Sequence, residues 1–177
     1  LQKFTQEFGR TTRTSGVVYT IPVVFHILHN YGPENISDAQ IYDAMRILNE
    51  DYRKLNADTT SIVASFQGIA SDSEIEFRLA TIDPNGNCTN GIDRIVTQLT
   101  YLAADPAKLN PWPNNKYLNI WVANSLENTG AAAYAYYPGA APTASVDGVM
   151  SRHNYVGSIG TSSSTGARTL THEIGHC

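Results

Sequence analysis

The sequence has only two cysteines, Cys88 and Cys177, and few charged residues among its 177 positions. Two cysteines are too few for a disulfide framework and lie too far apart for a zinc knuckle, so pairing with each other, free thiols and other partners all stay open. Lysine and arginine total 12 against 16 aspartates and glutamates. Because no basic stripe is available to bind phosphate, we expect no nucleic-acid partner.

The sequence also lacks an apolar run long enough to span a bilayer. The longest run, VVYTIPVVFHIL, is interrupted by Thr20, Pro22 and His26, so we expect no membrane segment. The chain starts at Leu1 without a methionine or a charged-then-apolar leader, and this start suggests a processed or excised product.

Hydrophobic periodicity predicts the secondary structure. The β-branched residues from Val17 to Leu28 are typical of a central strand, because apolar side chains occupy both alternations. Ser37 and Gln40 form a capping box, and the apolar spacing after them predicts a long helix that ends near Leu55. Further strands are predicted at residues 74–82, 92–99, 116–123, 130–138 and 146–150.

The order of these elements predicts an α/β sandwich. One strand and one helix come first, several strands follow, and a last helix carries two histidines, which together indicate a mixed sheet with helices packed on it. Residues 1–16 are polar and aperiodic and are expected to form an N-terminal arm. The remaining residues, 17–177, have the length of one ordinary domain.

The chain ends in the pattern HEIGHC. Residues four apart on an α-helix share a face, so His172 and His176 can present two imidazole nitrogens to one zinc ion. Glu173 lies one step around the helix, where a carboxylate can take a proton from an attacking water and pass it to a leaving amine. The pattern therefore predicts two zinc ligands and a general base. The alternative is a polar helix start with surface histidines.

Three other histidines and a cysteine are weaker candidates. His26 and His29 are three apart on a predicted strand, so they point to opposite faces and are expected to pack in the core or at its rim. His153 follows a strand directed toward the last helix and is either close to the cleft or an ordinary loop residue. Cys177 is rotated about 140° from His172 around a helix, which disfavours it as a third ligand.

Several blocks of the sequence, in order and spacing, resemble pappalysin-family metallopeptidases of the metzincin clan, and in particular the ulilysin group. The blocks are YTIPVVFHILHN, NISDAQIYDAMRILNEDYRKLN, IEFRLATIDPNGNCTNGIDRI, YLNIWVA, YAYYPGA, DGVM and GARTLTHEIGH. The resemblance implies a secreted zinc endopeptidase with a mixed, mostly parallel five-stranded sheet, a backing helix and an active-site helix. Residues 17–177 would form the upper, N-terminal subdomain of its catalytic domain.

The resemblance also assigns the site residues. His172, Glu173 and His176 match the first three positions of the family motif HExxHxxGxxH, so the third histidine and the methionine turn would lie beyond Cys177. The lower subdomain would then follow in the same or in a separate chain, and any calcium sites would lie mostly there. The expected partner is a protein or peptide substrate.

The segment Gly130–Pro138 alternates small and aromatic residues and ends in proline, as edge strands do. In metzincins the edge strand above the cleft pairs with an extended substrate, and this segment resembles it. The alternative for each tyrosine is that it covers apolar surface. The substrate-binding candidates are Ala131, Ala132, Ala133, Tyr134, Ala135 and Tyr136.

Two other functions stay open from the sequence. One is a non-catalytic remnant that keeps the peptidase fold as an interaction module. The other is an HExxH peptidase of a different clan, with a glutamate from a later helix as the third zinc ligand.

Overall fold

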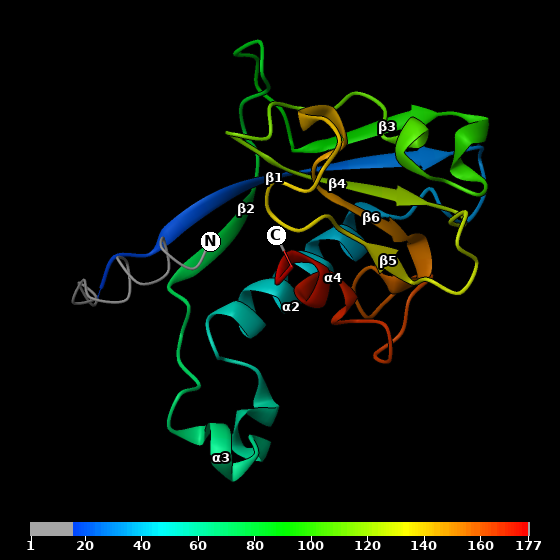
Figure 1. Cartoon of the computed structure of the whole chain (residues 1–177). Coiled ribbons are helices and arrows are strands. Elements are labelled where there is room, and N and C mark those ends of the chain that lie inside the picture. Colours follow the sequence, from blue (N-terminus) through cyan, green and yellow to red (C-terminus); the bar gives the residue numbers. More distant parts are fainter. Residues whose placement is uncertain (1–15, 177) are drawn as a thin grey trace.

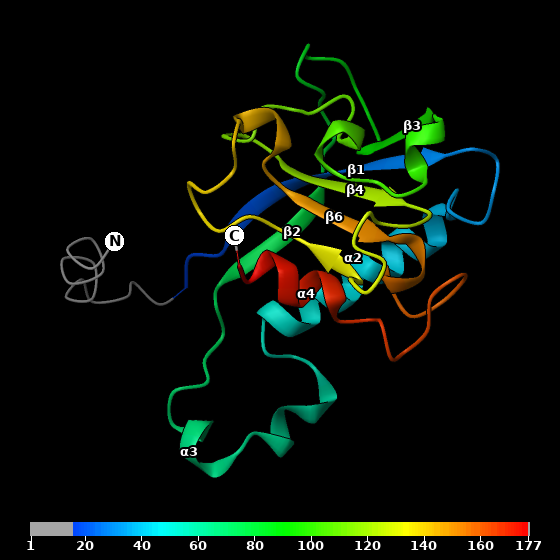
Figure 2. The same cartoon turned by 45° about the vertical axis from the view of Figure 1, so that its right-hand side comes forward.

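The computed structural model describes residues 16–176. Cys177 and the expected N-terminal arm, except Gly16, lie outside the described residues. Six strands form one sheet, with helices packed against one of its faces (Figures 1 and 2). The strands are β1 (Tyr19–His29), β2 (Ile75–Leu79), β3 (Ile92–Val96), β4 (Leu118–Ala123), β5 (Ala133–Tyr134) and β6 (Val149–Arg152).

The helices are few and mostly short. Only α2 (Asp38–Tyr52) exceeds ten residues among those between residues 16 and 176. The other α-helices are α3 (Ala64–Gln67) and α4 (Thr169–Ile174). Five 3₁₀ turns complete the described part: η1 (Ala57–Ser61), η2 (Gln98–Thr100), η3 (Asp105–Ala107), η4 (Ala144–Val146) and η5 (His153–Tyr155).

Strand β1 organises the sheet. Its first half pairs with β2 and its second half with β3, both parallel, so these two strands share one edge of β1. The other edge pairs with β4, which pairs with β6, and β5 closes the sheet in antiparallel orientation. The predicted mixed, mostly parallel sheet is therefore confirmed. Its six strands occupy five positions, because β2 and β3 follow one another along the same edge.

The two faces of the sheet bury different cores. On one face, Phe25 and Val122 pack with residues of α2 and α4, including Leu48 and Leu170. On the other face, Trp121 packs with residues from the loops around η3. Burial on both faces explains why β1 and β4 have nearly continuous apolar sequences.

Helix α2 begins as predicted and ends early. The Ser37 side chain accepts a hydrogen bond from the Gln40 backbone N–H, which confirms the N-cap. The expected end near Leu55 is wrong, because the helix stops at Tyr52 and Lys54 adopts a positive φ of 54°. Leu55 is 72% exposed at the start of a segment that carries η1 and α3 away from the sheet (Figure 1).

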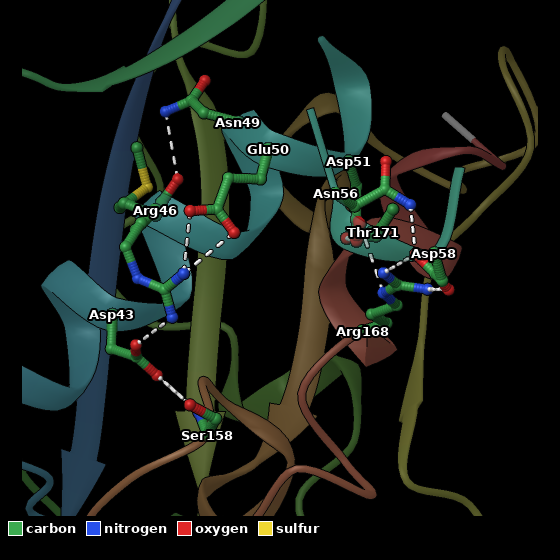
Figure 3. A network of polar contacts seen from close by, with 11 residues as sticks. Asp43, Arg46, Asn49, Glu50, Asp51, Asn56, Asp58, Ser158, Arg168 and Thr171 are labelled. Carbon is green, nitrogen blue, oxygen red and sulfur yellow. Dashed lines mark hydrogen bonds and ion pairs between the residues drawn. The ribbon is translucent and has the colours of Figure 1, made fainter. Parts of the chain in front are cut away.

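The polar side of α2 holds the loop that leads into α4. The Gln40 side-chain amide donates to the carbonyls of His153 and Val156, each at 2.9 Å. Asp43 accepts from both the backbone N–H and the hydroxyl of Ser158 (Figure 3). The Gln40 side chain therefore does not return to the N-cap residue, as a complete capping box requires. It binds instead the loop before α4, more than 100 positions away.

No helix between residues 16 and 176 combines the length and apolar character needed to cross a bilayer.

Candidate metal centre

Helix α4 carries the first of the two histidines and presents it to the surface. Leu170 and Ile174 are buried against α2 and the sheet, whereas His172 is exposed on another side of the helix. The expectation that both histidines lie within one α-helix is wrong by two residues. The helix ends at Ile174, and His176 lies in a tighter turn in which its N–H donates to the Glu173 carbonyl at 3.0 Å.

The two imidazole rings converge despite this early end. Their Nε2 atoms lie 3.1 Å apart, with ring centroids separated by 4.6 Å and ring planes at 89°. Two zinc–nitrogen bonds of about 2.0–2.1 Å at a tetrahedral angle place the nitrogens about 3.3 Å apart. The spacing of His172 and His176 therefore fits two ligands on one zinc ion.

Two histidines alone do not make a catalytic zinc site. Within residues 16–176, no group of three or more His, Cys, Asp or Glu side chains is arranged to hold a metal ion. A catalytic zinc site normally has three protein ligands. A catalytic site built on His172 and His176 would need a third ligand from outside the described residues.

Glu173 lies between the two histidines on α4 and is partly exposed. At about 100° per residue, its side chain leaves the helix next to that of His172 rather than in line with it. This placement suits a group that acts on the substrate side of a metal. The general-base role of Glu173 stays a prediction.

Tyr137 is a member of the site that the sequence did not single out. Its ring packs edge-on against His176, with centroids 5.3 Å apart and planes at 76°, and its side chain is 66% exposed. A signal was present, because Tyr136 and Tyr137 are consecutive. Consecutive residues in extended chain point to opposite faces, so one of the two had to face away from the other.

The predicted edge strand is shorter than expected but has the expected position. Only Ala133 and Tyr134 form β5, which stands at the end of the strand order. Ala135 packs with the core that contains α4. Ala131 packs with the opposite core, and the Ala132 carbonyl accepts the Arg152 N–H at 3.0 Å.

Tyr134 and Tyr136, unlike Tyr137, are turned away from the histidines. The hydroxyls of Tyr134 and Tyr136 both donate to Asp105, and the ammonium of Lys108 lies 4.6 Å and 5.0 Å from their ring centroids. Asp105 raises the pKa of the Tyr136 hydroxyl. Their side chains therefore anchor the strand on the face opposite α4.

The other histidines have structural partners. His26 is buried between Asp93 and Asn119, with its Nε2 3.0 Å from the Asn119 oxygen, and it stacks on Trp121. His29 is also buried, and its Nδ1 accepts the Tyr31 N–H. Core or rim packing is therefore confirmed for both.

His153 is half-buried in η5, and the structure does not group it with the histidines of the HEIGH pattern. Its carbonyl accepts from Gln40 and Thr161. Burial lowers the pKa of its imidazole, an effect opposed by Glu34 and reinforced by Arg152. His153 is therefore a loop residue, and its carbonyl helps to fix the loop that leads into α4.

The chain is similar in sequence and fold to known metalloproteases. Residues 101–177 match the family model Peptidase_M43, described as pregnancy-associated plasma protein-A. Mature mirolysin of Tannerella forsythia, solved in complex with a cleaved peptide, superposes with a TM-score of 0.82 at 38% identity, covering 91% of this chain. The resemblance to pappalysin-family metallopeptidases is confirmed.

Two further similar proteins extend the match. A promirolysin mutant from the same organism superposes with a TM-score of 0.80 at 34% identity and covers 99% of this chain. An extracellular metalloprotease of Trichophyton verrucosum is 26% identical over 181 residues. The chain spans 63% of mature mirolysin, 61% of promirolysin and 56% of the fungal protein.

Proposed function

We propose that this chain forms part of a zinc-dependent endopeptidase and supplies two of its three protein zinc ligands, His172 and His176. The observation that carries the proposal is the 3.1 Å approach of their Nε2 atoms in a pappalysin-like fold. The third ligand and the lower wall of the cleft would come from polypeptide outside residues 16–176. In this proposal residues 17–177 are the upper subdomain of the catalytic domain.

The proposed chemistry divides between the metal and Glu173. A zinc ion held by His172 and His176 would act as a Lewis acid that polarises the scissile carbonyl and favours deprotonation of the attacking water. The Glu173 carboxylate takes the proton of the attacking water and returns it to the amine that leaves. The position of Glu173 beside the histidine pair on α4 supports this division.

The proposed substrate is an extended peptide bound along β5. Its backbone would add to the sheet in antiparallel orientation through the main-chain groups of residues 131–136. Tyr137 would then line the cleft, since its ring already contacts His176. The peptide-bound mirolysin structure supports a peptide as the substrate class.

We also propose that the protein is secreted. The support is the similarity to an extracellular metalloprotease over 99% of this chain. Calcium binding stays a proposal from the family resemblance alone, and no described residue group carries it.

The test is metal analysis combined with a peptidase assay on the full-length protein. We expect one zinc ion per molecule and an activity that a chelator removes and zinc restores. Glu173→Gln should lower kcat about 10²–10⁴-fold with zinc retained, because only the proton transfer is lost. Full activity without zinc, or full activity of the Glu173→Gln variant, would contradict the proposal.

A further inference from the structure

Helix α4, which carries His172 and leads directly into His176, is too short to hold its own position. α4 has six residues, and its N-cap residue, Arg168, makes no side-chain capping bond. Isolated helices shorter than about 12 residues are marginal in water, so tertiary contacts must fix this one. Leu170 and Ile174 supply apolar contacts on one side. Apolar packing is non-directional and leaves rotation about the helix axis weakly defined.

A directional contact comes from the last turn of α2. The Thr171 hydroxyl donates to Oδ2 of Asp51 at 2.8 Å, and Nε of Arg168 lies 3.2 Å from Oδ1 of the same carboxylate (Figure 3). The Asp51 side chain is only 7% exposed, so this contact is shielded from solvent. Both oxygens of one nearly buried carboxylate therefore hold the start of α4.

An outer ion pair continues this contact at the surface. The guanidinium of Arg168 also donates to both oxygens of Asp58 and lowers the pKa of that carboxyl. The two side chains are 49% and 52% exposed. Solvent and salt screen such pairs, so the shielded Asp51 carboxylate is the stronger constraint.

The residues that Asp51 holds are those that support the histidine turn. The Arg168 carbonyl accepts the N–H of His172 at 3.1 Å. The Thr171 carbonyl accepts the N–H of Gly175, which directly precedes His176, at 3.2 Å. A shift of Arg168 or Thr171 therefore passes through one backbone hydrogen bond to the segment that carries each ring.

The position of Thr171 and Arg168 around the axis of α4 explains how their contact with Asp51 affects the histidines. At about 100° per residue, Thr171 and Arg168 lie on the side of α4 between the buried stripe and His172. Rotation that withdraws Thr171 from Asp51 also swings the His172 ring around the axis. His176 directly follows α4, so this angle sets the direction in which both converging rings face.

We propose that Asp51 is a positioning residue for the histidine pair, His172 and His176, and that it acts through Thr171 and Arg168. This inference rests on the proposed zinc-binding function of the same site. Asp51 touches neither metal nor substrate; it fixes the rotation of α4 and thereby pre-forms the two-histidine half of the site before metal binds.

The experiment measures zinc affinity by chelator competition in the full-length protein and thermal unfolding of the zinc-free form. Thr171→Val removes the hydroxyl at nearly constant volume, and Asp51→Asn removes the charge. Each should weaken zinc binding about tenfold, since changes in outer-shell partners of metal ligands typically cost 10–100-fold. Thr171→Ser keeps the donor and should stay within about twofold of the unchanged protein.

Glu50→Gln is the matched control. Glu50 is the neighbour of Asp51 on α2, has a side chain that is 41% exposed and pairs with Arg46 (Figure 3). It should leave zinc affinity unchanged. A purely structural role of the Asp51 contact would lower the unfolding temperature of Thr171→Val while its zinc affinity equals that of Thr171→Ser.

The outcomes separate the two proposals. Tight zinc binding by the unchanged protein, with equal affinity in Thr171→Val and Asp51→Asn, overturns the positioning role and leaves the peptidase proposal standing. An equal loss in Glu50→Gln also overturns the positioning role. Absence of zinc binding in the unchanged protein overturns both.

Discussion

The ring of Tyr137 stands edge-on against His176, with 5.3 Å between their centroids. Through this contact the end of the segment Gly130–Pro138 packs against the second histidine of the pair His172 and His176. The two belong to parts of the chain that are far apart in sequence. The contact therefore restrains the only ring of the pair that lies beyond the end of α4.

Replacing Tyr137 by alanine should weaken zinc binding about fivefold. An edge-on aromatic pair contributes about 1 kcal/mol, and its loss frees the His176 ring to rotate. Tyr137→Phe keeps the ring and should bind zinc as the unchanged protein does. Competition with a chelator measures both variants, and an equally weakened Tyr137→Phe would show that the hydroxyl, rather than the ring, is responsible.

Acid should destabilise the fold partly through His153. Burial holds the pKa of this imidazole below its ordinary value of about 6.5. The unfolded chain therefore binds the proton more readily, and the free energy of unfolding falls as pH drops through about 6.5 toward the folded-state pKa. Urea unfolding at pH 7.5, 6.5 and 5.5 measures this fall.

His153→Gln is the variant for that measurement, because it removes the titrating group. Its unfolding free energy should depend less on pH than that of the unchanged protein over the same range. Identical slopes for the two proteins would mean that His153 does not contribute to the acid response.

Gly148 should resist substitution more than Gly139. Both have positive φ, 135° and 75°. A Cβ at Gly148 would collide with the Asn119 carbonyl on β4 and approach the Trp121 ring to 3.0 Å, whereas a Cβ at Gly139 meets nothing within 4 Å. Gly148→Ala should cost about 3 kcal/mol of stability and Gly139→Ala about 1 kcal/mol. Equal costs in urea unfolding would refute the close approach of β6 to β4.

Most of the fold could be predicted from local sequence signals. The N-cap at Ser37 and the strands around Phe77 and Ile120 follow from capping chemistry and alternation, which act over a few residues. The end of α2 could not be predicted in this way. The apolar Leu55 continues the helical spacing, but the chain turns at Lys54 into the η1–α3 segment, where Leu55 stays exposed.

The convergence of the two histidines could be predicted, because it depends on their spacing in the sequence alone. The convergence of His172 and His176 follows from their separation of four residues, and it survives the end of α4 between them. The contact of Asp51 with Thr171 could not be predicted, because the two residues lie 120 positions apart. For Tyr137 the one sequence signal was its position next to Tyr136. The alternation of small and aromatic residues made Tyr134 and Tyr136 candidates for substrate binding. Both hydroxyls instead donate to Asp105, which holds the two side chains on the face of the sheet opposite α4.

The most direct measurement is a crystal structure of the full-length protein with anomalous diffraction data collected at the zinc absorption edge. The account predicts one anomalous peak about 2.0–2.1 Å from the Nε2 atoms of both His172 and His176. A peak bound to neither ring, or two rings that point apart in well-defined density, would contradict the central claim.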